Sequence, residues 1–238
     1  MRSPLIKITL QFIVVTTIVA AARAQLLHDD FNGTSIDPSL WQTSEPFSGS
    51  SITENGGNAV FDNRGRLITV GNFPPPITIT GAFDITGANS DEFKLVIRTD
   101  GTFVNDQFGE SANGFIVRFR SSSFFASDEV SILEIGGTAF SGWTGTLNLN
   151  TEYQFKVVDD GSNISVFLSD MNTPKASLAS TDSFGSKLVF YDREQIDSLM
   201  HETKLDFITV VPEPSSFVLL VFGGSSVATR FARSRKQI

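Results

Sequence analysis

Apolar and polar residues alternate along most of the chain between residues 25 and 211, and this period of two predicts β-strands rather than helices. In segment 93–98 the apolar residues Phe93, Leu95 and Ile97 alternate with Lys94, Val96 and Arg98. Segment 115–120 repeats the pattern. Both segments should therefore be half-buried antiparallel strands.

The clearest hairpin lies in residues 153–168. A strand over 153–158 turns at Asp159-Asp160-Gly161-Ser162 and returns over 164–168, and Asp-Gly supplies the positive-φ positions of a tight turn. Further strands are expected at 26–31, 59–61, 66–70, 77–80, 129–135, 187–191 and 204–211. Ten or more short strands separated by Gly, Asn, Asp and Ser predict an all-β fold, a two-sheet antiparallel jelly-roll sandwich.

The N-terminus has the pattern of a secretory signal peptide. Arg2 and Lys7 precede an apolar run over 8–22, and Ala22-Arg23-Ala24 matches the small-x-small cleavage pattern. We expect cleavage between Ala24 and Gln25. Residues 1–24 are then a cleaved signal peptide, and the remaining domain, 25–211, has a size typical of a single domain with one hydrophobic core.

The C-terminus, residues 212–238, predicts a single short hydrophobic helix. Its apolar stretch from 217 to 231 is shorter than the ~20 residues that cross a bilayer comfortably. A basic cluster of Arg233, Arg235 and Lys236 follows and should stay cytoplasmic, which leaves the preceding domain outside. An ordinary membrane anchor is the alternative. An amphipathic core helix is disfavoured by Pro212 and Pro214 and by the missing polar face.

Pro212-Glu213-Pro214, the short apolar span and the terminal basic cluster, in this order, resemble the PEP-CTERM sorting signal of bacteria. The resemblance implies processing by an exosortase-type membrane enzyme after passage through the export machinery. It also implies transient attachment to the membrane, followed by residence at the cell surface or in an extracellular matrix.

Charge and cysteine content exclude several classes of function. The segment 25–214 carries 11 basic and 26 acidic residues, a net charge of −15, which would repel a nucleic-acid backbone. The chain has no cysteine, so disulfides, thiolate metal sites and thiol nucleophiles are excluded. Its apolar core must therefore provide the stability, and 22 Phe residues can supply that core.

The opening segment from Asp29-Asp30-Phe31 to Leu40-Trp41 resembles the first strand and loop of the concanavalin A-like lectin/glucanase superfamily, which includes laminarinase-type glycosidases and laminin-G-like modules. Segments 153–160, 189–194 and 205–210 resemble it as well. The resemblance spans nearly all of 25–211 and implies the jelly roll, a fold that supports unrelated functions.

Laminarinase-type glycosidases carry three acids on one strand, as Glu-x-Asp-x-Glu or with one more residue before the last Glu. This chain has no complete copy: Asp192, Glu194 and Asp197 have the wrong order, and Glu129 and Glu134 should face opposite ways. A serine triad is also unsupported, because His28 and His201 are the only histidines and no Gly-x-Ser-x-Gly elbow is present. We therefore expect no enzymatic activity.

Sugar binding is the favoured function, since an aromatic ring and a few polar groups suffice for it. Trp143, in the glycine-flanked segment 141–145, is expected in a loop with its ring available to a ligand, near Asn148 and Asn150. Folding back onto the core is the alternative for this ring. Trp41 should be a core anchor of the first strand.

Calcium is the one expected cofactor. Superfamily members often hold a structural cation near the chain ends, and Asp29, Asp30 and Asp206 would meet if the first and last strands pair. Alternation places Asp206 on the same face as Ile208 and Val210, where a carboxylate needs a partner.

Together these observations predict an exported, non-catalytic carbohydrate-binding module whose partner is an extracellular polysaccharide. A structural envelope or matrix protein without a discrete sugar site is the main alternative. A degenerate glycosidase is the third possibility.

Overall fold

The computed structural model describes residues 27–46, 49–62, 64–86, 92–104, 111–121, 128–193 and 202–213. The expected signal peptide, His201 and the apolar tail lie outside these ranges. Residues 26–212 form one compact unit. Within the described ranges every regular element is a strand, and none contains a helix able to cross a membrane.

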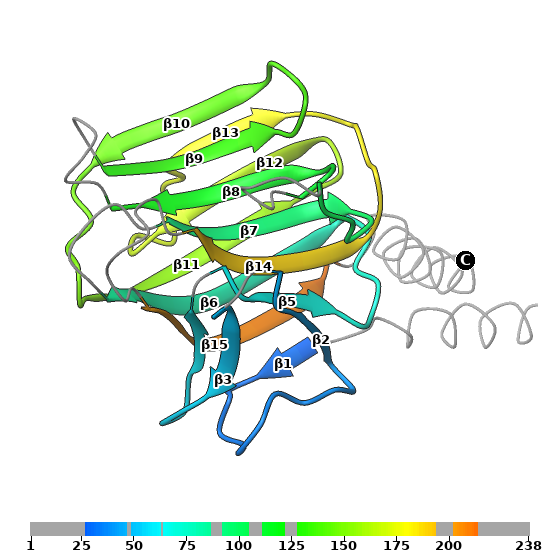
Figure 1. Ribbon diagram of the computed structural model, residues 1–238. Helices are drawn as coiled ribbons and strands as arrows, with labels where there is room; N and C mark the ends of the chain where they lie inside the picture. The colour runs from blue at the N-terminus through cyan, green and yellow to red at the C-terminus, as the bar shows by residue number, and fades with distance from the viewer. Residues whose placement is uncertain are drawn as a thin grey trace, which may run out of the picture. The chain divides into compact units, whose positions relative to one another are not determined.

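In the part of the chain that the structure describes, fifteen strands form two antiparallel sheets (Figure 1). The eight-stranded sheet has the order β13-β12-β11-β6-β15-β4-β3, with β1 added beside β15. Its strands are β13 (Ala176–Ala179), β12 (Asn163–Leu168), β11 (Glu152–Asp159), β6 (Ile77–Thr86), β15 (Glu202–Pro212), β4 (Ala59–Asp62), β3 (Ser51–Glu54) and β1 (Leu27–Asp29).

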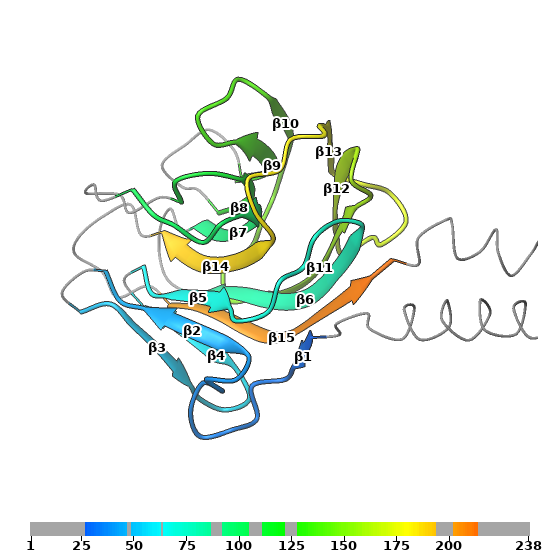
Figure 2. The same ribbon diagram turned by 90° about the vertical axis from the view of Figure 1, so that its right-hand side faces the viewer.

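The seven-stranded sheet has the order β10-β9-β8-β7-β14-β5-β2. Its strands are β10 (Phe140–Gly145), β9 (Asp128–Glu134), β8 (Phe115–Arg120), β7 (Glu92–Thr99), β14 (Lys187–Arg193), β5 (Arg66–Thr69) and β2 (Trp41–Ser44). The eight-stranded sheet curves around this sheet, so the outer face of the seven-stranded sheet is concave (Figure 2). The two-sheet antiparallel sandwich is confirmed.

The main core lies between the two sheets and is rich in phenylalanine. Phe83 of β6 lies 4.9 Å from Phe93 of β7 and 4.8 Å from Phe119 of β8, measured between ring centroids. Phe155 of β11 lies 5.5 Å from Phe119. These rings join the inner faces of both sheets, and their burial stabilises the fold of a chain that has no cysteine for disulfides.

The predicted strands are all present, and the hairpin is confirmed as β11 and β12. Its turn differs in detail, because only Gly161 takes a positive φ, of 90°. The Asp160 carboxylate instead accepts the backbone N–H groups of Ser162 and Asn163, both at 2.7 Å. An Asx-type side chain therefore closes the turn.

Two expectations about strand faces are corrected. Strand β7 is buried on both faces rather than half-buried, because a second apolar cluster covers its outer side. Strand β15 shifts register against β6 between Leu205 and Phe207. Asp206 lies in this bulge and is partly exposed, so its carboxylate needs no buried partner.

Candidate functional site

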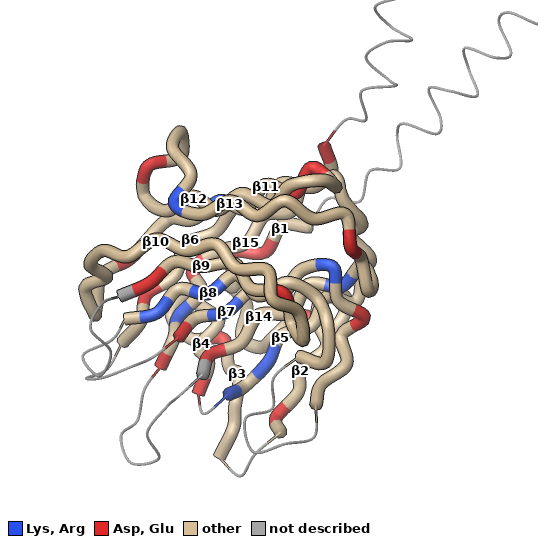
Figure 3. The backbone as a smooth tube through the Cα atoms, turned by 90° about the horizontal axis from the view of Figure 1, so that it is seen from above, with Lys and Arg blue, Asp and Glu red and all other residues tan. Residues whose placement is uncertain are grey.

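The concave face carries a compact group of charged side chains at its centre. Strand β7 contributes Glu92 and Lys94, strand β8 contributes Arg118 and Arg120, and strand β9 contributes Glu129. These positions alternate with core residues and therefore point away from the inter-sheet core. Figure 3 shows the Lys and Arg segments of β7 and β8 lying side by side. We call these five residues the charge cluster.

Strand register explains how residues from three strands meet. Glu92 lies directly opposite Arg120, and Arg120 lies directly opposite Glu129. The neighbouring row on the same face, two residues further along the strands, pairs Lys94 with Arg118. Cross-strand neighbours of this kind lie close enough for side-chain contact, so charges alternate in sign along the row of Glu92, Arg120 and Glu129, whereas Lys94 and Arg118 are both positive.

Glu129 is the carboxylate of the charge cluster nearest to solvent. Its Oε1 pairs with Nη2 of Arg118 and its Oε2 pairs with Nη2 of Arg120. The Glu129 side chain is 12% exposed, whereas that of Glu92 is 0% exposed. A molecule that approaches the concave face can therefore reach Glu129 but not Glu92.

Burial alone would raise the pKa of Glu129. A hydrogen bond with Ser131, a hydrogen bond with Arg118 and the positive charges of Arg118 and Arg120 oppose burial and hold the pKa of Glu129 below its ordinary value. The Ser131 hydroxyl also accepts Nε–H of Arg118 at 3.3 Å. Glu129 is therefore an ionised carboxylate at neutral pH, suited to act as a base or nucleophile.

Glu129 and Glu134 keep the spacing of the longer laminarinase-type pattern, with Ser131 in place of its middle Asp. The pattern is incomplete because Ser131 is not acidic. The pairing of β8 with β9 is continuous from Arg120–Glu129 to Phe115–Glu134, with no bulge. Glu129 and Glu134 are five residues apart, so their side chains leave β9 on opposite faces. That expectation about their faces is confirmed.

Trp143 is not in a loop. It lies in edge strand β10 opposite Val130 of β9, and its partly buried ring packs against the main core. The Lys175 ammonium lies 4.8 Å from the centroid of this ring. The expectation of a loop tryptophan was wrong because pairing with β9 makes a strand of a glycine-flanked segment.

Asn148 and Asn150 are exposed in the connection between β10 and β11. The Asn148 backbone N–H donates to the Tyr153 hydroxyl at 2.7 Å, and the Asn150 N–H donates to the carbonyl of Ile85 at 2.9 Å. Their side chains remain available, and their role in sugar binding, like that of Trp143, stays a prediction.

The chain ends meet as expected, because β1 pairs with β15 and Asp29 lies opposite Ile208. Both carboxylate oxygens of Asp29 are already engaged: Oδ1 accepts the N–H of Phe31 at 2.9 Å, and Oδ2 accepts Nε1–H of Trp41 at 2.6 Å. Trp41 is buried, which confirms its role as a core anchor.

Within the described ranges no three His, Cys, Asp or Glu side chains gather as a metal site. Asp29, Asp30 and Asp206 therefore do not form a carboxylate cage, and calcium binding with backbone carbonyls stays a prediction. His28 is exposed on β1 and its Nδ1 lies 2.8 Å from Thr209 Oγ1, which fits a plain surface residue.

No family profile matches the sequence, and no curated protein matches it. Solved structures do match. An immunostimulatory antigen and pseudo β-1,3-glucanase of Mycobacterium tuberculosis has a TM-score of 0.60 at 14% identity, covering 79% of this chain and 98% of that one. A laminarinase catalytic domain from Thermotoga petrophila has a TM-score of 0.58 at 12% identity, covering 81% and 99%.

An endo-β-1,3-glucanase from Pyrococcus furiosus has a TM-score of 0.57 at 11% identity, covering 79% and 94%. These likenesses show that the chain has the concanavalin A-like jelly-roll fold of β-glucanases. They also correct two expectations, the non-catalytic binding module and the absence of enzymatic activity, because the structures that share the fold include glycoside hydrolases.

Proposed function

We propose that the protein is a glycoside hydrolase that acts on a β-linked polysaccharide at its concave face. The observation that carries this proposal is the position of Glu129: an ionised, partly exposed carboxylate on the concave face, at the first position of the acidic pattern. The β-glucanase-type jelly roll supports it.

Glu129 acts as the nucleophile or base, because a carboxylate held ionised by two arginines cannot deliver a proton to the leaving group. Retaining enzymes use such a group as a nucleophile, and inverting enzymes use it to activate water. The anomeric configuration of the first product, followed by NMR, distinguishes these two routes.

Glu134 keeps the spacing of the pattern and is partly exposed at the end of β9. It leaves β9 on the face opposite Glu129. Glu129 and Glu134 therefore cannot flank one glycosidic bond, and Glu134 is not assigned as the proton donor.

The test is release of reducing ends from β-1,3-, β-1,4- and mixed-linkage glucans by the wild-type chain and by single variants. We expect Glu129→Gln to lose about 10²-fold or more of the activity. The matched control is Glu152→Gln, an exposed glutamate on β11 of the other sheet, which should keep full activity. Absence of product with every glucan, or full activity of the Glu129 variant, contradicts the proposal.

We also infer that the chain is exported, held transiently at the membrane by its C-terminal segment and released to the cell surface or matrix. The order of Pro212-Glu213-Pro214, apolar span and basic cluster supports this. An exosortase-type enzyme would cut near the tripeptide. Mass spectrometry of the secreted protein should find a C-terminus near Pro214, and replacement of the tripeptide by three alanines should retain the full tail.

A further inference from the structure

Glu92 is a fully buried carboxylate in the charge cluster, and the proposed reaction does not use it. Its Oε2 lies 3.0 Å from Nζ of Lys94, its neighbour on β7. Its Oε1 lies 3.8 Å from Nη1 of Arg118 and 3.7 Å from Nη1 of Arg120. One carboxylate therefore faces three cations.

The two arginines bind Glu92 and Glu129 through different ends of each guanidinium group. In both, Nη1 faces Glu92 and Nη2 pairs with Glu129. A guanidinium group is planar and rigid, so fixing Nη1 also fixes the direction of Nη2. The contacts of 3.7 and 3.8 Å are ion pairs too long for hydrogen bonds, so the attraction of Glu92 biases the position of each exposed end rather than fixing it.

We infer that Glu92 is a positioning residue that holds Arg118 and Arg120 against Glu129. Its consequence for catalysis rests on the proposed function. Arginine side chains have several rotatable bonds, and on a strand face open to solvent they would sample many rotamers. The anchor from β7 biases them toward the rotamers in which each arginine binds one oxygen of Glu129.

The position of Ser131 explains why an anchor from another strand is used. The middle residue of the acidic pattern would be the nearest anion to Glu129 on β9, but here it is a serine that accepts Nε–H of Arg118. The second negative charge of the group comes instead from β7. Glu92 takes this place two strands away, in register with Arg120 and Glu129.

Other charged groups also lie near Glu92 and contribute to the pH dependence of the charge cluster. Lys94 lies over the ring of Tyr191 from β14, with Nζ 5.5 Å from the centroid. Arg193 of β14 lies opposite Glu92 in register, although its side chain is outside the described part of the chain. The described cluster contains three cations and two carboxylates, a net charge of +1, so removal of Glu92 alone would raise its buried positive charge to +2.

The test variant is therefore the double substitution Glu92→Gln with Lys94→Met, which removes one negative and one positive charge and keeps the net charge of the cluster. The readout is the titration of Glu129, followed through its carboxyl ¹³C resonance in the full chain, expressed with its signal peptide so that the host processes it. Glu129→Gln assigns the resonance. Glu134→Gln, which changes a β9 glutamate outside the cluster, is the control.

If Glu92 positions the arginines, the double variant titrates Glu129 at a higher pH than wild type, because the arginine contacts that favour its ionised form are loosened. The acid limb of the pH–rate profile then moves upward with it. An unchanged Glu129 titration in a folded double variant overturns the inference. A wild-type chain without hydrolase activity contradicts the proposed function instead, because the NMR titration needs no turnover.

Discussion

Arg98 of β7 reaches across the sandwich to Asp159 of β11, with Nε 2.8 Å from Oδ2 and Nη2 2.5 Å from Oδ1. Both side chains are almost fully buried. The remaining Nη1 donates to the carbonyls of Ser180 and Asp182, at 2.9 and 2.8 Å. One bidentate ion pair thus ties the two sheets together and holds the chain segment between β13 and β14.

Removal of one partner of this pair should be costly. Asp159→Asn leaves the Arg98 charge buried and opposed by a neutral amide, and loss of one member of a buried pair typically costs about 3 to 5 kcal/mol. The double variant Arg98→Met with Asp159→Asn should recover part of that loss, because no buried charge is left. Urea unfolding of the three proteins measures this. Equal stability of Asp159→Asn and wild type would show that the pair contributes no net stability.

Strong alternation made much of the fold predictable. Strand β8 was predicted with its observed bounds, because Phe115, Val117 and Phe119 alternate with polar residues except at Ile116. Strands β2, β3, β10 and β13 were missed, since segments such as Trp41-Gln42-Thr43-Ser44 and the glycine-containing β10 have little intrinsic strand pattern. Pairing with neighbouring strands makes them strands, and this pairing is not readable from local sequence.

The candidate site was less predictable than the fold for the same reason. Arg118 and Arg120 occupy the polar positions of β8, which for an isolated strand indicate a solvent-facing side. Their partners lie on the two adjacent strands. In the sequence, Glu92 precedes the two arginines by 26 and 28 positions, and Glu129 follows them by 11 and 9. Only the register of β7, β8 and β9 shows that these charges meet.

Trp143 should contribute to stability through its packing against the core and its contact with Lys175. Because the ring is only partly buried, Trp143→Ala should cost about 2 to 3 kcal/mol, below the value typical of a fully buried tryptophan. Trp143→Phe should keep most of the stability that the tryptophan ring contributes. Urea unfolding measures the stability of both variants. Retention on polysaccharide gels separates packing from ligand contact. A Trp143→Phe variant that folds normally but is no longer retained assigns the Trp143 ring to substrate binding.

Calcium binding at the paired chain ends is testable through the melting temperature. A cation that binds only the folded protein raises stability with its concentration. Millimolar Ca²⁺ should therefore raise the melting temperature relative to chelator, and Asp206→Asn should reduce the increase. Mg²⁺ at the same concentration is the control, since it demands a stricter octahedral site. Identical melting in Ca²⁺ and in chelator removes this cofactor.

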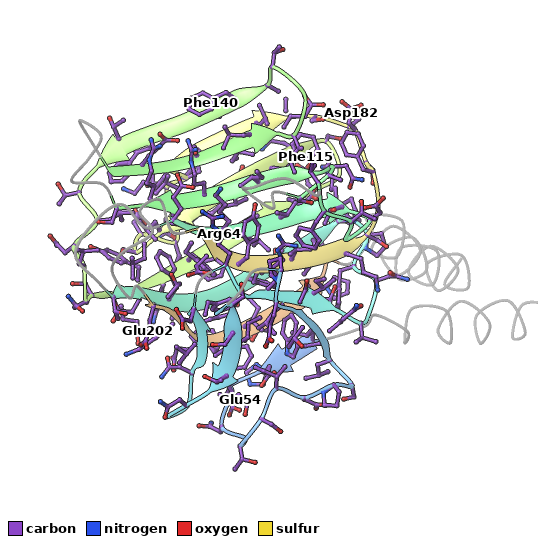
Figure 4. All side chains as sticks on the ribbon, viewed as in Figure 1. Glu54, Arg64, Phe115, Phe140, Asp182 and Glu202 are labelled. Atoms are coloured by element: carbon purple, nitrogen blue, oxygen red, sulfur yellow. The ribbon has the colours of Figure 1, made fainter. Side chains whose placement is uncertain are left out.

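Glu54 of β3 lies at the opposite end of the molecule from Phe140 (Figure 4) and has a pKa raised above its ordinary value. Burial is the largest cause, the charges of Asp29 and Asp37 add to it, and the backbone N–H groups of Ser35 and Gly33 oppose it. The folded state therefore holds the Glu54 proton to a higher pH than the unfolded chain does.

This difference predicts that the free energy of unfolding falls as pH rises from the unfolded pKa, near 4.5, through the folded pKa of Glu54. Glu54→Gln removes the titration, so the variant should melt at a higher temperature than wild type at pH 7 and at nearly the same temperature at pH 4. Glu45→Gln, an exposed glutamate in the segment after β2, is the control and should not change the pH dependence. Melting is followed in chelator, because a bound cation would neutralise Glu54. A Glu54→Gln variant less stable than wild type at pH 7 would mean that the hydrogen bonds from the loop amides outweigh the burial and repulsion of its charge.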